Sequence, residues 1–110
     1  MANKSTDVVR GTLDMLVLRT LELRPLNGIA IADRIRQVTN GTFSVGPGSL
    51  FPALHRLEQE GWIKGAWSMG DRGRRMRAYT LTAAGRRHLA AERKTWARIV
   101  AAVGQVLDQG

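Results

Sequence analysis

The sequence predicts an α+β fold that is mainly α, and three observations support it. Apolar residues recur at helical spacing in three short segments between residues 12 and 60. Two β-prone segments then flank the turn at residues 70–73, as the strands of a β-hairpin do. Residues 83–107 return to helical spacing without a proline. Three short helices, a hairpin and a long C-terminal helix together predict a winged helix-turn-helix fold.

Residues 12–38 are expected to contain the first two helices. The apolar stripe of residues 12–23 is broad enough for that helix to be largely buried. Pro25 ends it, because the residue before a proline is pushed out of helical space. Asn27 is expected to cap the second helix, which Asn40-Gly41 closes. Residues 42–45 alternate and are β-prone, so a one-rung strand is expected there.

A third helix is expected to begin with Ser49 as its N-cap and to end at Gly61. Pro52 would then occupy the third helical position, whose amide is unpaired in any helix. The face opposite the leucines is polar, so it could enter a major groove about 12 Å wide and contact base edges. An ordinary solvated face is the alternative. The residues predicted to contact DNA from this helix are Ser49, Pro52, His55, Arg56 and Gln59.

The predicted hairpin has strands over residues 62–69 and 74–81, and its tip is rich in arginine. Guanidinium groups match phosphate oxygens bidentately. Such a wing could therefore run along DNA phosphates or place an arginine in the minor groove. The alternative is a turn whose charge only keeps the hairpin soluble. The predicted wing contacts are Arg72, Arg74, Arg75 and Arg77.

The last predicted helix covers residues 83–107, with Thr82 as its cap, and would be roughly 37 Å long at 1.5 Å per residue. Residues 1–81 are expected to form a winged-helix DNA-binding domain, and residues 82–110 a C-terminal dimerisation helix packed on it. The far apolar half would meet a second copy in a two-fold dimer, or alternatively fold back on the first helix. Trp96 could also stack a flat ligand. The predicted dimer residues are Leu89, Trp96, Ile99, Val100, Val103 and Leu107.

The net charge of the chain comes from one quarter of it. Lys and Arg number 17 and Asp and Glu number 9, which gives a net charge of +8 and a pI near 11.5. Residues 72–98 contain nine of these cations and one anion, and so sum to +8. The remaining eight cations and eight anions cancel. A charge run is often only a solvated face, but segregation this complete favours a surface that binds an anionic partner.

The composition also excludes several classes of function. The chain has no cysteine, which removes disulfides and thiolate metal sites, and a metal site built on its two histidines would need help from carboxylates or a partner chain. No candidate catalytic group has a partner that the sequence identifies, so we expect neither an enzyme nor a cofactor. The N-terminus has no apolar signal core, and no apolar run approaches the roughly 20 residues that span a bilayer. We therefore expect a cytoplasmic protein without a membrane partner.

Three segments of the chain resemble the PadR family of bacterial transcriptional regulators. They read GTLDMLVL at residues 11–18, GSLFPALHRLEQEG at residues 48–61, and GRRMRAYTLTAAG at residues 73–85. The resemblance runs from about Arg10 to Val103, nearly the whole chain, and the order and spacing of the segments make it specific. A C-terminal region of one helix is similar to that of the family's shorter subfamily.

The resemblance implies a homodimeric winged-helix repressor that binds an imperfect palindrome in double-stranded DNA. Members of the family commonly respond to small aromatic compounds or drugs. By position, residues 49–56 correspond to the family's recognition helix, residues 72–77 to its wing and residues 83–107 to its dimer helix. This chain has Phe51 where the recognition helix usually has a tyrosine, so a hydroxyl contact to the DNA backbone is missing.

Two other functions are compatible with the same residues. The basic quarter alone could serve a sequence-neutral nucleic-acid binder, either nucleoid-associated or directed at RNA. The last helix could instead dock on a different protein, in which case the chain would be an adaptor. Preference for one DNA site over bulk DNA separates the first alternative from a specific regulator. The oligomeric state of the purified chain tests the second.

Overall fold

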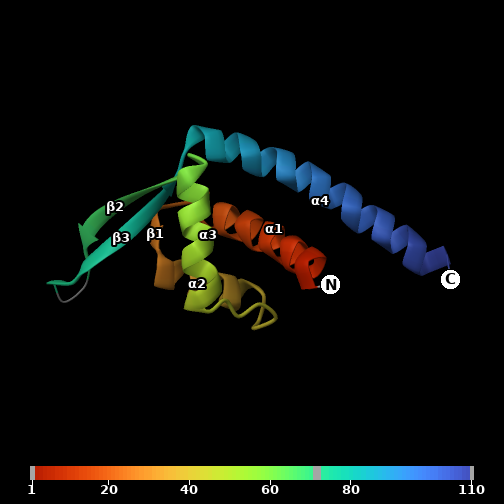
Figure 1. Ribbon diagram of the computed structural model, residues 1–110, viewed down its shortest axis with the longest axis horizontal. Helices are drawn as coiled ribbons and strands as arrows, with labels where there is room; N and C mark the ends of the chain where they lie inside the picture. The colour runs from red at the N-terminus through yellow and green to blue at the C-terminus, as the bar shows by residue number, and fades with distance from the viewer. Residues whose placement is uncertain (1, 71–72, 110) are drawn as a thin grey trace.

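The predicted winged-helix architecture is confirmed in the computed structural model, which describes residues 2–70 and 73–109, with side chains from residue 11 onward. Figure 1 shows the wing and the far end of the last helix projecting in opposite directions from a body of three helices. The elements in chain order are α1 (Ala2–Thr20), β1 (Leu26–Asn27), α2 (Gly28–Val38), α3 (Pro47–Gln59), β2 (Ile63–Met69), β3 (Arg75–Leu81) and α4 (Ala83–Gln109).

The sheet is antiparallel with the order β1-β3-β2. Its first strand lies at residues 26–27, where Leu26 is opposite Tyr79, and the prediction of a strand at residues 42–45 is wrong. That segment is bound to the end of α2 instead, since the Phe43 amide donates to the Thr39 hydroxyl over 3.1 Å. Asn27 caps α2 as predicted, because its side chain accepts from the Ala30 amide at 2.9 Å.

Helix α1 is longer than its apolar stripe indicated. It begins at Ala2 instead of residue 12 and ends at Thr20, three residues before the predicted end. Residues 2–10 contain neither proline nor glycine, so nothing in them interrupts a helix, but they carry no continuous apolar stripe by which it could be recognised. At the C-terminal end, the Thr20 hydroxyl donates to the Leu16 carbonyl over 2.7 Å.

Helix α3 begins three residues earlier than predicted, and its N-cap is Gly46 instead of Ser49. The amides of Ser49 and Leu50 both donate to the Gly46 carbonyl, so the helix is already established at Pro47. Pro52 therefore lies in the helix interior, where it has no N–H to donate to the Gly48 carbonyl. Gly48 and Pro52 are both exposed residues, so water can replace the missing donor and the position tolerates a proline.

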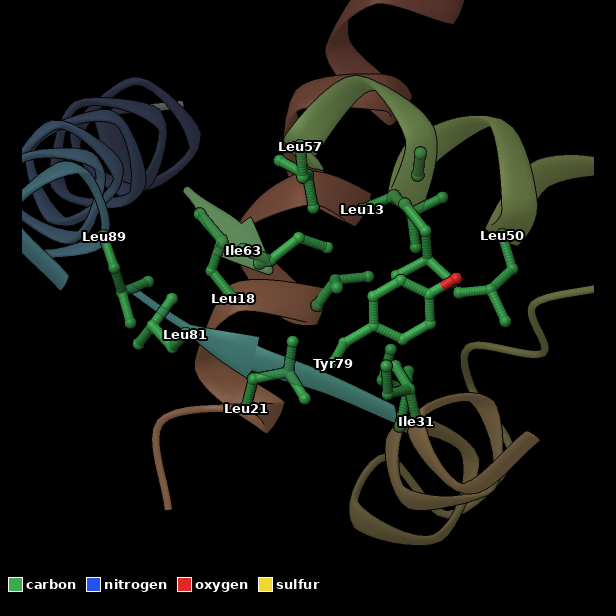
Figure 2. Packing of buried hydrophobic residues seen from close by; sticks show 14 residues of the cluster. Leu13, Leu18, Leu21, Ile31, Leu50, Leu57, Ile63, Tyr79, Leu81 and Leu89 are labelled. Carbon is green, nitrogen blue, oxygen red and sulfur yellow. The ribbon is translucent and has the colours of Figure 1, made fainter. Parts of the chain in front are cut away.

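The core is a single cluster of aliphatic side chains around Tyr79, drawn from every helix and from β2 and β3 (Figure 2). Leu89 lies beside Leu81 in this cluster and is only 1% exposed. The prediction that Leu89 belongs to a dimer interface is therefore wrong, because the chain's own body already covers it. The body therefore covers this face of α4 at least as far as Leu89, whereas the next residue of the seven-residue repeat, Trp96, is 41% exposed.

The junction between the hairpin and α4 is tightly packed. Thr82 caps α4 as predicted: its hydroxyl accepts from the Gly85 amide at 3.0 Å and donates to the Gly61 carbonyl at 2.7 Å. A Cβ atom at Gly85 would collide with the Trp62 carbonyl oxygen, so only glycine allows this approach. Gly61 ends α3, as predicted, with a positive φ of 78°. These contacts fix the direction in which α4 leaves the body.

Among the side chains that the structure describes, only the first part of α4 is packed against the rest of the chain. The helix has 27 residues, and the molecule measures 57 × 28 × 27 Å. Its first half runs beside α1, and its far half extends beyond the body (Figure 1). Over the residues that the structure describes, no helix combines the length and the apolar character needed to cross a membrane.

Candidate nucleic-acid interface

The outward face of α3 carries four exposed residues at helical spacing, which we call the outward stripe: Gly48, Pro52, His55 and Gln59. They lie opposite the buried residues Leu50, Leu54 and Leu57. Three of the five predicted recognition residues are thus brought together in this stripe. Apart from His55, the stripe contains no ionisable side chain. Its functional groups are a proline ring, an imidazole and a primary amide.

The other two predicted recognition residues face α1 instead. Arg56 donates from Nη2 to Asp14 Oδ1 over 2.7 Å, and both side chains are half-buried. Ser49 is exposed, but it lines a groove that it shares with α1 and α4. Arg56 is therefore not the free cation that the sequence indicated, and Ser49 is not part of the outward stripe.

One face of the wing gathers its arginines around a tryptophan. Trp67 is opposite Arg77 and Met69 is opposite Arg75 in the strand register, so these four side chains share a face, which we call the Trp67 face. The Arg75 guanidinium lies over the Trp67 ring at 4.8 Å from its centroid. Trp67 itself is 59% exposed. A cation held over an indole face is restricted in orientation while its N–H groups remain available to phosphate.

Arg77 is bound to the recognition helix. Its Nη2 donates to Glu58 Oε2 over 2.6 Å, and this hydrogen bond raises the pKa of the Arg77 guanidinium. The side chain crosses Gly65, where any Cβ would collide with the guanidinium group. Arg77 was predicted to hold a phosphate, but in the free protein its charge already has a partner on α3.

Two predicted wing arginines remain, Arg74 and Arg72. Arg74 is exposed and has no acidic partner among the described residues. Arg72, the fourth predicted wing contact, lies outside the described residues. Among the predicted wing arginines that the structure describes, Arg74 and Arg75 are therefore the ones whose side chains remain available to an anion.

The far half of α4 presents a continuous apolar surface. Trp96 is 41% exposed, and the residues that follow it on the same face are more exposed still. We call this the α4 stripe: Trp96, Ile99, Val100, Val103, Val106 and Leu107. A monomer rarely leaves so many large apolar side chains in one row without a partner.

A mainly apolar groove of about 440 Å³ lies at the base of this stripe. Its walls come from α1, from the segment before α3, from the start of α3 and from the Trp96 indole on α4. Lining residues are Thr12, Leu13, Met15, Leu16, Phe43, Ser44, Val45, Ser49 and Trp96. Among the described residues, no cluster of three or more His, Cys, Asp or Glu side chains could hold a metal ion.

This arrangement of recognition helix, cationic wing and long terminal helix corresponds to a known family. The profile of the transcriptional regulator PadR-like family matches residues 17–91, more than half of the chain. The chain belongs to the PadR-like family. PadR-like regulators are DNA-binding proteins and not enzymes, so the chain is a DNA-binding transcriptional regulator.

Two relatives in sequence differ in how much of their length the chain spans. An uncharacterised protein of Lysinibacillus sphaericus is 28% identical over 94 residues, which are 86% of each chain. A transcriptional regulator of Mycobacterium tuberculosis is 37% identical over 59 residues, and these cover 54% of each chain. The chain thus matches about half the length of this second relative.

Solved structures of PadR-like proteins share the fold over nearly their whole length. A transcriptional regulator from Clostridium thermocellum superposes with a TM-score of 0.82 at 26% identity, covering 90% of this chain and 96% of that one. A PadR family transcription regulator from Clostridium difficile gives a TM-score of 0.75 at 29% identity, covering 86% and 96%.

Within the PadR-like fold, three side chains acquire roles that were not predicted from the sequence: Asp14, Glu58 and Trp67. The sequence signals Trp67 only in part: it lies on a predicted strand beside the arginine-rich turn, but counting back from a turn at residues 70–73 pairs it with Met76 and not with Arg77. Glu58 and Asp14 carry no comparable signal. Their partners lie 19 and 42 residues away in the sequence, and only the packing of the helices brings each pair together.

Proposed function

We propose that the chain is a homodimeric repressor that binds a two-fold symmetric operator. Two copies would pair along the α4 stripe, and their two α3 helices would enter successive major grooves about 34–36 Å apart. The wing arginines Arg74 and Arg75 would hold phosphates beside each groove. In this proposal residues 1–81 act as the DNA-binding domain and residues 82–110 as the dimerisation helix.

The observation that carries the proposal is the α4 stripe. Its apolar side chains recur at intervals of three and four residues, the spacing that helices use to pack along one another. A two-fold axis beside such a helix packs the stripe against its own copy, so that each contact from one residue to another is made twice and no stripe stays uncovered. The same axis would place two recognition helices in one complex, which a palindromic site requires.

We further propose that a small aromatic effector binds in the groove beside Trp96. The groove is lined by apolar side chains, an exposed indole and residues 43–45, which lead directly into α3. A ligand there would touch both the dimer helix and the start of the recognition helix. It would weaken DNA binding by its differential affinity for the two arrangements of these elements.

Selection of bound sites from random DNA tests operator recognition. We expect an enriched sequence with two-fold symmetry, bound at least about a thousandfold more tightly than bulk DNA. Transcription in vitro from a promoter carrying that site should fall when the protein is added. Equal binding to all sequences would contradict a specific regulator, and a rise in transcription would contradict repression.

The dimer is tested separately by sedimentation of Val103→Asp. A carboxylate in the α4 stripe would be buried without a partner in the dimer, so we expect the variant to sediment as a folded monomer and to lose operator affinity. Gln105→Asp places the same charge on the opposite face of α4 and is the matched control. Monomeric wild-type protein at micromolar concentration would overturn the dimer.

The effector is tested by titrating planar aromatic compounds against the fluorescence of the protein. Quenching that is lost in Trp96→Phe, together with release of DNA at the same ligand concentrations, is the expected result. Quenching that persists in this variant would assign the signal to Trp62 or Trp67 and contradict a site beside Trp96.

A further inference from the structure

The chemistry of the outward stripe limits which bases it can recognise. Arginine on guanine is the commonest specific contact in a major groove, because its fork matches O6 and N7. The stripe has no arginine or lysine, and the acidic and the basic residue within α3, Glu58 and Arg56, are both bound to other elements. Arg56 is bound to Asp14 at 2.7 Å, and Glu58 to Arg77 at 2.6 Å. The groups left facing outward on the stripe are a proline ring, an imidazole and a primary amide.

The start of α3 is apolar where it is most exposed. Pro52 projects from the outward stripe, and Phe51 beside it is 50% exposed. The Phe51 ring is held against the start of α2, since a Cβ at Gly28 would lie only 3.2 Å from it. In helix-turn-helix proteins the first residues of the recognition helix contact the base edges. This end of the helix therefore offers DNA carbon surface.

Thymine is the one base that presents a methyl group in the major groove. Adenine, its partner, presents N6 and N7, which a glutamine amide binds bidentately. Gln59 is exposed on the same stripe as Pro52, two helical turns later. An A·T pair thus matches the proline ring and the amide of the outward stripe, whereas a G·C pair has no methyl and its commonest specific partner is a cation.

We propose that α3 recognises A·T pairs, with Pro52 and Phe51 against thymine methyl groups and Gln59 on an adenine. Pro52 and Phe51 are then specificity-determining residues, and Asp14 and Glu58 contribute by binding the two nearest arginines internally. The inference rests on the proposed function, because it requires α3 to lie in a major groove.

The test is to replace thymine by uracil in the selected operator, one position at a time. Uracil keeps every hydrogen-bonding group of thymine and lacks only the C5 methyl, so any loss of affinity reports apolar contact. At positions beneath α3 we expect about a fourfold loss for each methyl that is buried against the protein. Positions between the half-sites should show no loss.

Pro52→Ala links the effect to the residue. Alanine restores an N–H for the Gly48 carbonyl and favours a helix, so the variant is expected to fold. It should bind the thymine and uracil operators with nearly equal affinity at the sensitive position. Gln59→Ala is the matched control: it should weaken binding to both operators by the same factor and leave their ratio unchanged.

Two results overturn the inference alone: an enriched palindrome that binds equally well with uracil throughout, or G·C pairs beneath α3 whose preference disappears in Arg56→Ala. A thymine-to-uracil ratio that Pro52→Ala and Phe51→Ala both leave unchanged also overturns it, because the methyl contact then lies elsewhere. A selection that enriches no sequence overturns the proposed function and this inference with it.

Discussion

The outward stripe of α3 and the Trp67 face of the wing differ in the kind of contact that each can make with DNA. The stripe offers a proline ring, an imidazole and an amide, which act at contact distance and depend on the base that they meet. The wing offers guanidinium groups, which bind any phosphate. The difference teaches that, in the proposed complex, choice of sequence and strength of binding would depend on separate elements of this small fold.

The two regions are chemically distinct but mechanically joined. Glu58 on α3 immediately precedes Gln59 of the outward stripe, and it binds Arg77 of the Trp67 face. The wing therefore cannot shift relative to the stripe without stretching this ion pair. Arg56 and Asp14 make a similar connection from α3 to α1, the helix that lines the groove beside Trp96.

The largest effect is expected when the wing loses its available cations. Replacing both Arg74 and Arg75 by alanine should weaken binding to operator and random DNA alike, by roughly a hundredfold at low salt, since one charged hydrogen bond contributes about 1.5 kcal/mol. The slope of log affinity against log salt should fall by about two. Affinity measured over a salt series for both DNAs checks this.

The matched control for the wing variant comes from the stripe. Gln59→Ala removes a base contact and no charge, so it should weaken only operator binding and leave the salt slope unchanged. If the double arginine variant lowered operator affinity while random DNA was bound as before, the wing would be selecting sequence, and the assignment of the two regions would be reversed.

A smaller effect is expected when the ion pair between the two regions is cut. Glu58→Gln frees Arg77 to bind phosphate, so affinity for random DNA should rise several-fold and the salt slope should steepen by about one. Preference for the operator should fall in proportion. The control is Glu60→Gln. It removes the same charge two residues further along the chain, from a residue that has no ion pair among the described side chains. An equal rise in both variants would show that net charge alone is responsible.

The smallest effect is expected at the indole beneath Arg75. A cation–π contact at an exposed site is worth about 0.5–1 kcal/mol, so Trp67→Leu should weaken DNA binding about two- to fivefold without changing the salt slope. A double-mutant cycle with Arg75→Ala measures the coupling directly. Strictly additive losses would mean that Trp67 does not orient Arg75.

Features that depend on neighbouring residues could be predicted from the sequence. The caps Asn27 and Thr82 and the glycine that ends α3 each rely on a hydrogen bond or a φ angle set within a few residues. The start of α3 was misplaced because Gly46 and Ser49 are both acceptable N-caps. Pro47, which suits the first helical position, decides between them.

Features that depend on the packing of distant segments could not be predicted. The charge run at residues 72–98 located the wing correctly, but it could not show that Arg77 is bound to α3 while Arg75 is not. Nor could a seven-residue repeat show that the body ends beyond Leu89, since the spacing is the same on both sides of that point. In each case the sequence does not show which part of the folded chain lies against the residue.

The length of α4 turns a small angle into a large displacement. Its 27 residues span about 40 Å at 1.5 Å per residue, and Gly85 is locked against Trp62 at the end nearest the body. A tilt of about 5° about that end moves the far tip by about 3.5 Å, close to the 3.4 Å rise of one base pair. In the proposed dimer, a rotation of α4 by a few degrees about Gly85 would therefore suffice to shift the two DNA-binding domains out of register with their half-sites.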